Sequence, residues 1–179
     1  MFNKLLVALD HSPMADRVMA KAMAIGQANQ AELLLLHVLS GEEEDSPLPI
    51  PPGAEEIYWA PGTGFNLDIW RKQWETYEQE CLDQLHQRSA LAQTAGIATQ
   101  VKQIAGSPGR SICHQAKVWG ADLIVIGHRG RLGLQELILG SVSNYILHHA
   151  PCAVLTVKTA LDEDSNGKQL PDNHQGARR

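Results

Sequence analysis

The chain has few cysteines, no excess of basic residues and no long apolar run. Its three cysteines, Cys81, Cys113 and Cys152, show no C-x-x-C spacing, so the sequence suggests neither a disulfide framework nor a zinc site. The net charge of −5 argues against a nucleic-acid-binding protein, which normally shows a basic balance or patch. No run reaches the ~18 apolar residues of a membrane helix, and the N-terminus resembles a strand rather than a signal peptide. We therefore expect a cytoplasmic protein that does not bind nucleic acid or a membrane.

Apolar runs alternate with helical patterns along the chain. The 179 residues are 44% hydrophobic and 20% charged, which fits one domain with one substantial core. Continuous apolar runs are typical of parallel strands covered on both faces, and Ser12-Pro13 and Ser107-Pro108 are helix starts, a cap followed by proline. The alternation predicts a Rossmann-like α/β fold, an open parallel sheet with helices on both faces. The predicted strands are 3–9, 33–38, 97–104 (at an edge), 122–126 and 153–157.

A long helix is predicted over 67–95, ending at Gly96. Its apolar residues recur at helical spacing and should form one buried face: Trp70, Trp74, Tyr77, Cys81 and Leu85.

Residues 40–66 interrupt this pattern. An acidic cluster at 41–45 precedes five prolines, so the segment should be a loop that is either functional or disordered. The acidic run could bind a cation, but we favour a solvated linker face. Tyr58, Trp59 and Phe65 indicate that its second half docks somewhere, as a lid or a partner-binding segment. We predict a domain over 1–158 with this insert, followed by a disordered tail over 159–179.

One glycine-rich segment carries the strongest functional signal. Gly127-His128-Arg129-Gly130 follows a predicted strand, and Gly140-Ser141 comes nine residues later and opens a short helix. A strand end, a glycine turn and a helix N-terminus together favour phosphate binding, because the backbone approaches closely and free amides attract negative charge. His128, Arg129 and Arg131 add side-chain donors. The alternative is that these glycines only turn the chain between two elements.

The same segment resembles the signature of the ATP-binding branch of the universal stress protein family, in which Gly-x-x-Gly is followed after nine residues by Gly-Ser. Three further segments are similar to that family: the opening strand with Asp10-His11-Ser12, the second strand ending in His37-Val38, and the closing strand 151–157. The resemblance covers 1–158 apart from the insert. His128 departs from it, since the family more often has serine there. The resemblance implies the strand order 3-2-1-4-5, a homodimer through strand 153–157, and adenine read by the main chain at Val38 with Ala8 beneath the nucleoside.

In that strand order the winding reverses between the first and fourth strands, where open α/β sheets bind ligands beyond the carboxyl ends. Asp10 and Gly127 both lie at this point. We expect Gly127, Gly130 and Gly140 to allow close approach of the triphosphate. Asp10 is a candidate to bind ribose, adenine or a metal-bound water, or else to cap the turn into the first helix. Phosphate oxygens should be bound by the amides of Ser141, Val142 and Ser143. Ser141 either caps its helix in addition to binding phosphate or acts only as a cap.

Mg²⁺ or Mn²⁺ should accompany ATP on its phosphates, without a protein cage for the metal. No catalytic residue is assigned, because Asp10 and His128 are only candidate bases and the chain lacks the G-x-x-x-x-G-K-[ST] loop. His37 is interpreted as a strand-end histidine rather than a ligand. Three functions remain: an ATP-binding regulatory protein with an unknown protein partner, a slow ATPase or phosphotransferase, and a nucleotide-free assembly module. Electron transfer with a flavin is a distant fourth. We favour the first.

Overall fold

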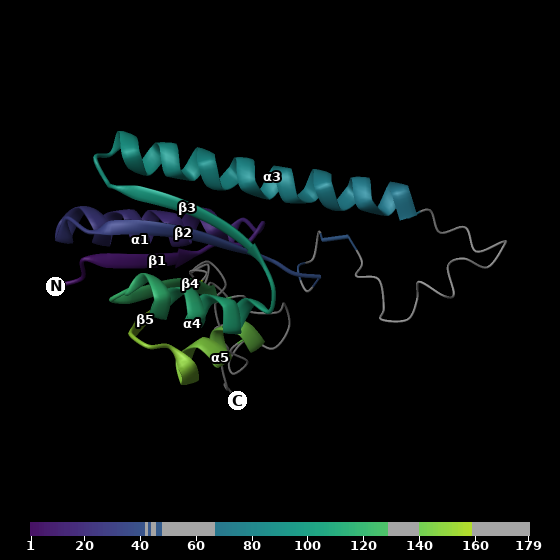
Figure 1. Ribbon diagram of the computed structural model, residues 1–179. Helices are drawn as coiled ribbons and strands as arrows, with labels where there is room; N and C mark the ends of the chain where they lie inside the picture. Colours follow the sequence, from purple (N-terminus) through teal and green to yellow (C-terminus); the bar gives the residue numbers. More distant parts are fainter. Residues whose placement is uncertain (42, 44–45, 48–66, 129–139, 159–179) are drawn as a thin grey trace, which may run out of the picture.

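One parallel sheet of five strands organises the chain, in the order β3-β2-β1-β4-β5 (Figure 1). The computed structural model describes residues 1–41, 43, 46–47, 67–128 and 140–158. All neighbouring strands in the sheet pair in parallel. The fold class and the strand order are therefore confirmed. The strands are β1 (Lys4–Ala8), β2 (Glu32–Leu39), β3 (Thr99–Ala105), β4 (Leu123–His128) and β5 (Ala153–Lys158).

Helices cover both faces of the sheet. On one face, α1 (Met14–Asn29) and α3 (Leu67–Thr94) pack against β1, β2 and β4 through a core that includes Val18 and Leu85. On the other face, α4 (Pro108–Trp119) and α5 (Ser141–His149) pack through Ile112 and Ile146. We call these the α1/α3 face and the α4/α5 face. Side chains that alternate along each strand therefore go to two different cores.

The burial of each strand follows its place in the sheet. Leu33 through Leu39 are all buried in β2, because this strand has neighbours on both sides and helices on both faces. β3 and β5 form the two edges, and β3 alternates between exposed and half-buried residues. The mixed polarity of 97–104 thus predicted an edge strand correctly.

The predicted boundary signals hold for the start of α4 and the end of α3 but not for the start of α1. Ser107 precedes α4 with Pro108 in its first turn, and Gly96 has the left-handed φ of +80° expected just beyond α3. The prediction for α1 was wrong by one residue, because the helix begins at Met14 and Pro13 is its N-cap. The hydroxyl of Ser12 donates to Asp10 instead of capping the helix, a local hydrogen bond that competes with the cap.

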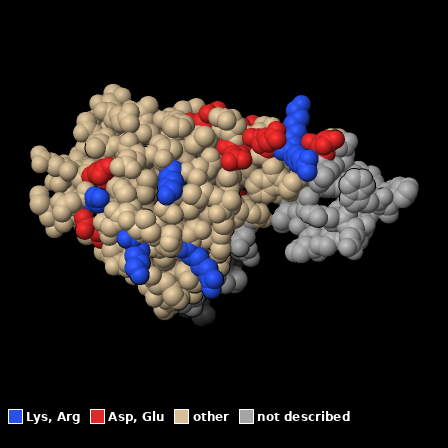
Figure 2. Space-filling model, in the orientation of Figure 1, with Lys and Arg blue, Asp and Glu red and all other residues tan. Residues whose placement is uncertain are grey.

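The described surface has acidic side chains along α3, while Lys and Arg side chains on the face shown in Figure 2 stand apart from one another. Within the described ranges, no helix has both the length and the apolar composition needed to cross a bilayer. The predicted tail over 159–179 and most of the 40–66 insert lie outside the described residues.

Candidate functional site

β1 and β4 separate at their carboxyl ends. They pair from Leu5 with Leu123 to Val7 with Val125, and no further pair of β1 with β4 follows in the described chain. Ala8 continues to pair only with β2, while β4 continues along β5 as far as His128 with Lys158. The two backbones therefore diverge at the predicted switch point. The sequence suggested that Gly127 and His128 follow the strand. They lie inside β4 instead, because pairing with β5 keeps their backbone extended.

Apolar residues predicted to contact the nucleoside lie on one face of the sheet. Ala8 and Val142 pack against the cluster on the α4/α5 face that contains Val38. The fold thus brings the first turn of α5 to β1 and β2, which lie more than a hundred positions earlier in the sequence. These residues are packed into the core of this face of the sheet.

The first turn of α5 lies against the end of β4. Asn144 donates the first helical hydrogen bond to the carbonyl oxygen of Gly140, at 2.9 Å, so the amides of Ser141, Val142 and Ser143 have no acceptor within the helix. The hydroxyl of buried Ser143 donates to the carbonyl oxygen of Gly127 at 3.3 Å. This hydrogen bond fixes the helix terminus beside the strand end, where unpaired amides can meet an anion.

Ser141 does not cap α5. The N-cap is Gly140, and no side-chain cap hydrogen bond is present there. Ser141 is the first helical residue and is exposed, so its hydroxyl faces solvent rather than an amide of its own helix. The interpretation of Ser141 as a helix cap was therefore wrong, because the helix starts one residue earlier than a cap at Ser141 requires. Gly140 itself has open space around an added Cβ, so packing among the described residues does not require glycine there.

Gly127 is required by packing between α1 and β4. A Cβ at this position would lie 2.7 Å from Cγ of Met14 and 3.3 Å from Cγ2 of Val18. Its backbone is not in the left-handed region. The glycine thus allows α1 to approach the sheet, a role that the sequence pattern did not reveal.

Asp10 organises the turn between β1 and α1. Its Oδ1 accepts a hydrogen bond from the amide of Ser12 at 3.1 Å and another from the Ser12 hydroxyl. Asp10 therefore caps the turn into the first helix, which was the predicted alternative to ligand binding. The carboxylate is half-buried at the carboxyl edge of the sheet.

His128 presents a polar atom without a protein partner in the described ranges. Its Nδ1 is shielded from solvent and forms no hydrogen bond there. By strand alternation with Ile124 and Ile126, its side chain belongs to the α4/α5 face, with Ala8 and Val38. Arg129, Gly130 and Arg131 lie outside the described residues, so the structure gives no account of this half of the predicted phosphate site.

A second polar cluster lies on the α1/α3 face, and the sequence did not predict it. Nε2 of His37 lies 3.1 Å from Oε1 of Glu43, and the Tyr77 hydroxyl donates to the same carboxylate. Side-chain exposure is 3% for His37 and 12% for Glu43. For Glu43 the interpretation of the acidic run as a solvated face was wrong. His37 lies two residues before the end of β2 at Leu39, and it is buried there.

The electrostatics of this second cluster follow from its burial. Burial, together with the hydrogen bond to Glu43, raises the pKa of Tyr77 above its ordinary value of 10.0, so the phenol stays protonated as the donor. Burial likewise raises the pKa of neighbouring Cys81 to about 11. No sequence signal could have found this cluster, since its members come from a strand, the turn after it and a helix about 34 residues further on.

Solved structures with this architecture include the universal stress protein UspA from Lactobacillus plantarum, with a TM-score of 0.65, 24% identity, and coverage of 87% of this chain and 97% of that one. A universal stress protein in complex with cAMP has a TM-score of 0.54 at 20% identity and covers 88% and 97% of the two chains. The universal stress protein from Archaeoglobus fulgidus in complex with dAMP has a TM-score of 0.51 at 19% identity, covering 86% and 96%. At these identities the likeness shows the fold.

Sequence relatives carry the assignment further. Universal stress protein Sll1388 of Synechocystis sp. is 37% identical over 157 residues, which are 88% of this chain and 98% of the relative. Universal stress protein Slr1101 of the same organism is 50% identical over 105 residues, or 59% of this chain and 97% of the relative. The model of the universal stress protein family matches residues 1–158. This chain therefore belongs to the universal stress protein family.

Proposed function

We propose that the protein is a regulatory member of its family that binds ATP with Mg²⁺ or Mn²⁺ at the carboxyl edge of the sheet. The observation that supports this most is the hydrogen bond from Ser143 to the carbonyl of Gly127, which holds the open N-terminus of α5 beside the end of β4. Two structural neighbours are complexes with cAMP and dAMP, ligands that share an adenine nucleoside and a phosphate with ATP. Ala8 and Val38 would contact the nucleoside on the α4/α5 face.

The size of each contact indicates how many are needed. A helix N-terminus contributes about 0.3–1 kcal/mol to binding an anion, and up to ~2 kcal/mol where it is partly buried. Micromolar affinity corresponds to about 8 kcal/mol. The amides of α5 alone are therefore insufficient. We propose that Arg129 and Arg131 supply further charge, that Gly127, Gly130 and Gly140 leave room for the phosphates, and that His128 donates from its unpartnered nitrogen.

Turnover should be slow. Fast phosphoryl transfer needs a group that orients the attacking nucleophile, together with charge stabilisation at the γ-phosphate. Asp10 is the candidate carboxylate at the switch point, and its Oδ1 already accepts two hydrogen bonds from Ser12. We therefore favour a nucleotide-dependent regulator over an ATPase, with hydrolysis far below the ~1–100 s⁻¹ of kinases. Rapid turnover that disappears in Asp10→Ala would favour the ATPase instead.

The edge strand β5 is the proposed dimer interface. It is the last strand in the sheet order, so one side of its backbone has no strand partner among the described residues. An uncovered edge with apolar side chains invites pairing with another strand. A two-fold related copy would pair with it in antiparallel register. The dimer would present two nucleotide sites to a protein partner whose identity the fold does not specify.

Analysis of nucleotide released on denaturation tests the proposal. Protein purified without added ligand would be denatured and filtered, and the filtrate separated by ion-exchange chromatography against ATP, ADP, AMP and cAMP standards. We expect ATP or its products close to one per chain. Ligand-free protein would then be titrated with ATP in the presence of Mg²⁺ and, separately, Mn²⁺. Absence of nucleotide in the filtrate together with no heat of binding would favour the nucleotide-free assembly module.

A further inference from the structure

We propose that His37, Glu43 and Cys81 form a binding site for one divalent transition-metal ion, with zinc as the best match. The site lies on the α1/α3 face of the sheet, whereas Ala8 and Val38 belong to the α4/α5 face. It therefore lies on the other face of the sheet from the proposed nucleoside contacts, although Asp10, a candidate ligand contact, lines the cavity beside it. The proposed Mg²⁺ or Mn²⁺ would be bound by the phosphates of ATP, whereas this ion would be bound by protein side chains.

The geometry brings three different ligand atoms to one point. One ligand atom each from His37, Glu43 and Cys81 lies within 4.8 Å of the other two. In a tetrahedral zinc site with bonds of about 2.0–2.3 Å, neighbouring ligand atoms are roughly 3.4–3.6 Å apart. Nε2 of His37 and Oε1 of Glu43 are already 3.1 Å apart, so rotamer adjustments within the cluster suffice. A nitrogen, oxygen and sulfur set of this kind suits zinc rather than magnesium or calcium, which prefer oxygen ligands.

Burial makes the site more than a chance grouping of polar surface residues. His37 is 2% exposed and Cys81 is 4% exposed, and Glu43 is largely covered. A carboxylate placed there needs compensation, because a buried charge without a partner is costly. Hydrogen bonds supply it in this structure, since the His37 ring and the Tyr77 hydroxyl both face the carboxylate. A divalent cation would compensate Glu43 more strongly and would also hold Cys81 as a thiolate.

The chain around each ligand is fixed by further contacts. Glu43 sits in a turn closed by Ser46, whose hydroxyl donates to the Glu43 carbonyl at 2.8 Å. Nδ1 of His37 lies 3.3 Å from the side-chain amide of Gln103 on β3. With metal on Nε2, Nδ1 would carry the proton and donate to the amide oxygen of Gln103, after that amide turns over. Outer contacts of this kind orient ligating histidines in zinc sites.

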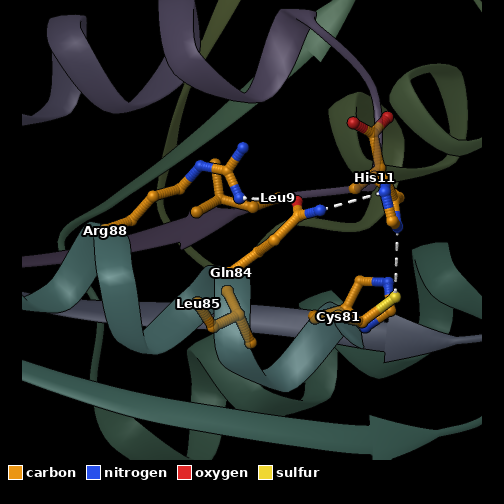
Figure 3. A pocket seen from close by; sticks show the side chains of 8 residues that line it. Leu9, His11, Cys81, Gln84, Leu85 and Arg88 are labelled. Carbon is orange, nitrogen blue, oxygen red and sulfur yellow. Dashed lines mark hydrogen bonds between the residues drawn. The ribbon is translucent and has the colours of Figure 1, made fainter. Parts of the chain in front are cut away.

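A fourth coordination position lies beside Cys81. A cavity of about 10 Å³, enough for roughly one water molecule, is lined by Asp10, His11, His37 and Cys81 among others. Nδ1 of His11 is 3.6 Å from Sγ of Cys81, close to the ~3.5 Å expected between nitrogen and sulfur ligands of one zinc ion. Figure 3 shows His11 and Cys81 facing each other, with Gln84 beside His11. Either a water or His11 would complete the coordination.

Binding of the ion has a defined proton balance. The Cys81 thiol releases one proton to solvent, and His37 binds the ion through Nε2 as a neutral imidazole with its proton on Nδ1; any second ring proton also goes to solvent. His11 would likewise bind as a neutral imidazole if it became the fourth ligand. The ion would connect β2, the turn at Glu43 and α3, and through His11 it would reach the turn that holds Asp10. The rival explanation is a metal-free hydrogen-bonded clamp of the same residues.

Cobalt substitution tests the site on the full chain. Protein stripped of metal with a chelator would be titrated with Co²⁺, followed by absorption of the sulfur-to-cobalt charge-transfer band and of the d–d bands. We expect saturation at one equivalent, tetrahedral d–d intensity, and loss of both signals when one equivalent of Zn²⁺ is added. Cys81→Ser should abolish the charge-transfer band, and Glu43→Gln should weaken cobalt affinity at least tenfold.

Cys113→Ser provides the matched control, because Cys113 packs on the α4/α5 face away from the cluster. This variant should keep the wild-type spectrum. Circular dichroism would verify that each variant is folded, and Glu43→Gln, which keeps the side-chain volume, gives a second test if Cys81→Ser does not fold. No charge-transfer band in the wild type, or a band that survives Cys81→Ser, would overturn the metal site and leave the hydrogen-bonded clamp.

Discussion

A Cβ on Gly127 would lie 2.7 Å from Cγ of Met14, so the first glycine of the Gly-x-x-Gly motif makes room for α1. Real Cβ atoms do not approach other carbons so closely, and β-branched Val18 is also within 3.3 Å. The absence of a side chain at this position therefore serves the core, whether or not a nucleotide is bound.

Gly127→Ala should consequently destabilise the protein without nucleotide. We expect a loss of about 1–3 kcal/mol in the free energy of unfolding, the usual cost of overpacking a core. Urea denaturation would measure it. Met14→Ala should relieve the clash, so the double variant should lose less stability than the sum of the two single losses. Additive losses would show that Met14 does not oppose the new methyl group.

The insert can be shortened without loss of the fold if Glu43 and Ser46 are retained. Replacing residues 48–64 with a short Gly-Ser linker should change the free energy of unfolding by no more than about 1–2 kcal/mol, because long surface loops add little stability. By contrast, Tyr77→Phe removes a donor to a buried carboxylate and should cost about 1.5–3 kcal/mol. A collapse of the linker variant would show that Tyr58, Trp59 or Phe65 belongs to the core.

The proposed dimer can be weakened at Thr156 without disturbing the core. Leu155 and Val157 pack into the α1/α3 face, so charges there would damage the fold itself, whereas Thr156 is polar and half-buried near the middle of β5. In antiparallel pairing about a two-fold axis, Thr156→Lys would bring like charges close together. Sedimentation equilibrium should show at least tenfold weaker association for Thr156→Lys and little change for Thr156→Gln. A wild-type protein that is monomeric at micromolar concentration would refute the interface.

The thiols on the α4/α5 face should react slowly. Burial raises the pKa of Cys113, and burial together with nearby Asp122 raises that of Cys152. A raised pKa lowers the thiolate fraction at any given pH below it, and the thiolate is the nucleophile. In a Cys81→Ser background, alkylation at pH 7.5 should be slower than for a free cysteine peptide and should accelerate as the pH rises. Mass spectrometry would assign each rate, and rates equal to the peptide's at pH 7.5 would contradict the shift.

The sequence predicted the sheet well and the second polar cluster not at all. Strands such as 33–38 are recognisable because burial on both faces leaves a continuous apolar run. Glu43 meets Tyr77 and His37 only in the folded protein, because these residues lie in different elements of the chain. The acidic run and the prolines after it therefore did not indicate that Glu43 is buried. Gly127 was placed at a strand end because local patterning could not show that β5 would extend the pairing of β4 to His128.

The central claim is that the open N-terminus of α5 binds the phosphates of a nucleotide, and Ser141 tests it most directly. Ser141 is exposed, is not the N-cap and makes no described contact with the core, so substitutions there should leave the fold intact. Ser141→Glu places a negative charge where a triphosphate would lie, while a carboxylate in the first turn favours an empty helix terminus. Ser141→Gln is the neutral control of the same size.

Calorimetric titration with ATP and Mg²⁺, paired with thermal melts without ligand, measures both effects on the same samples. We predict that Ser141→Glu lowers ATP affinity at least tenfold while its melting temperature is unchanged or slightly raised, and that Ser141→Gln binds ATP within a few-fold of wild type. Equal ATP affinity in Ser141→Glu and wild type would contradict phosphate binding at the N-terminus of α5.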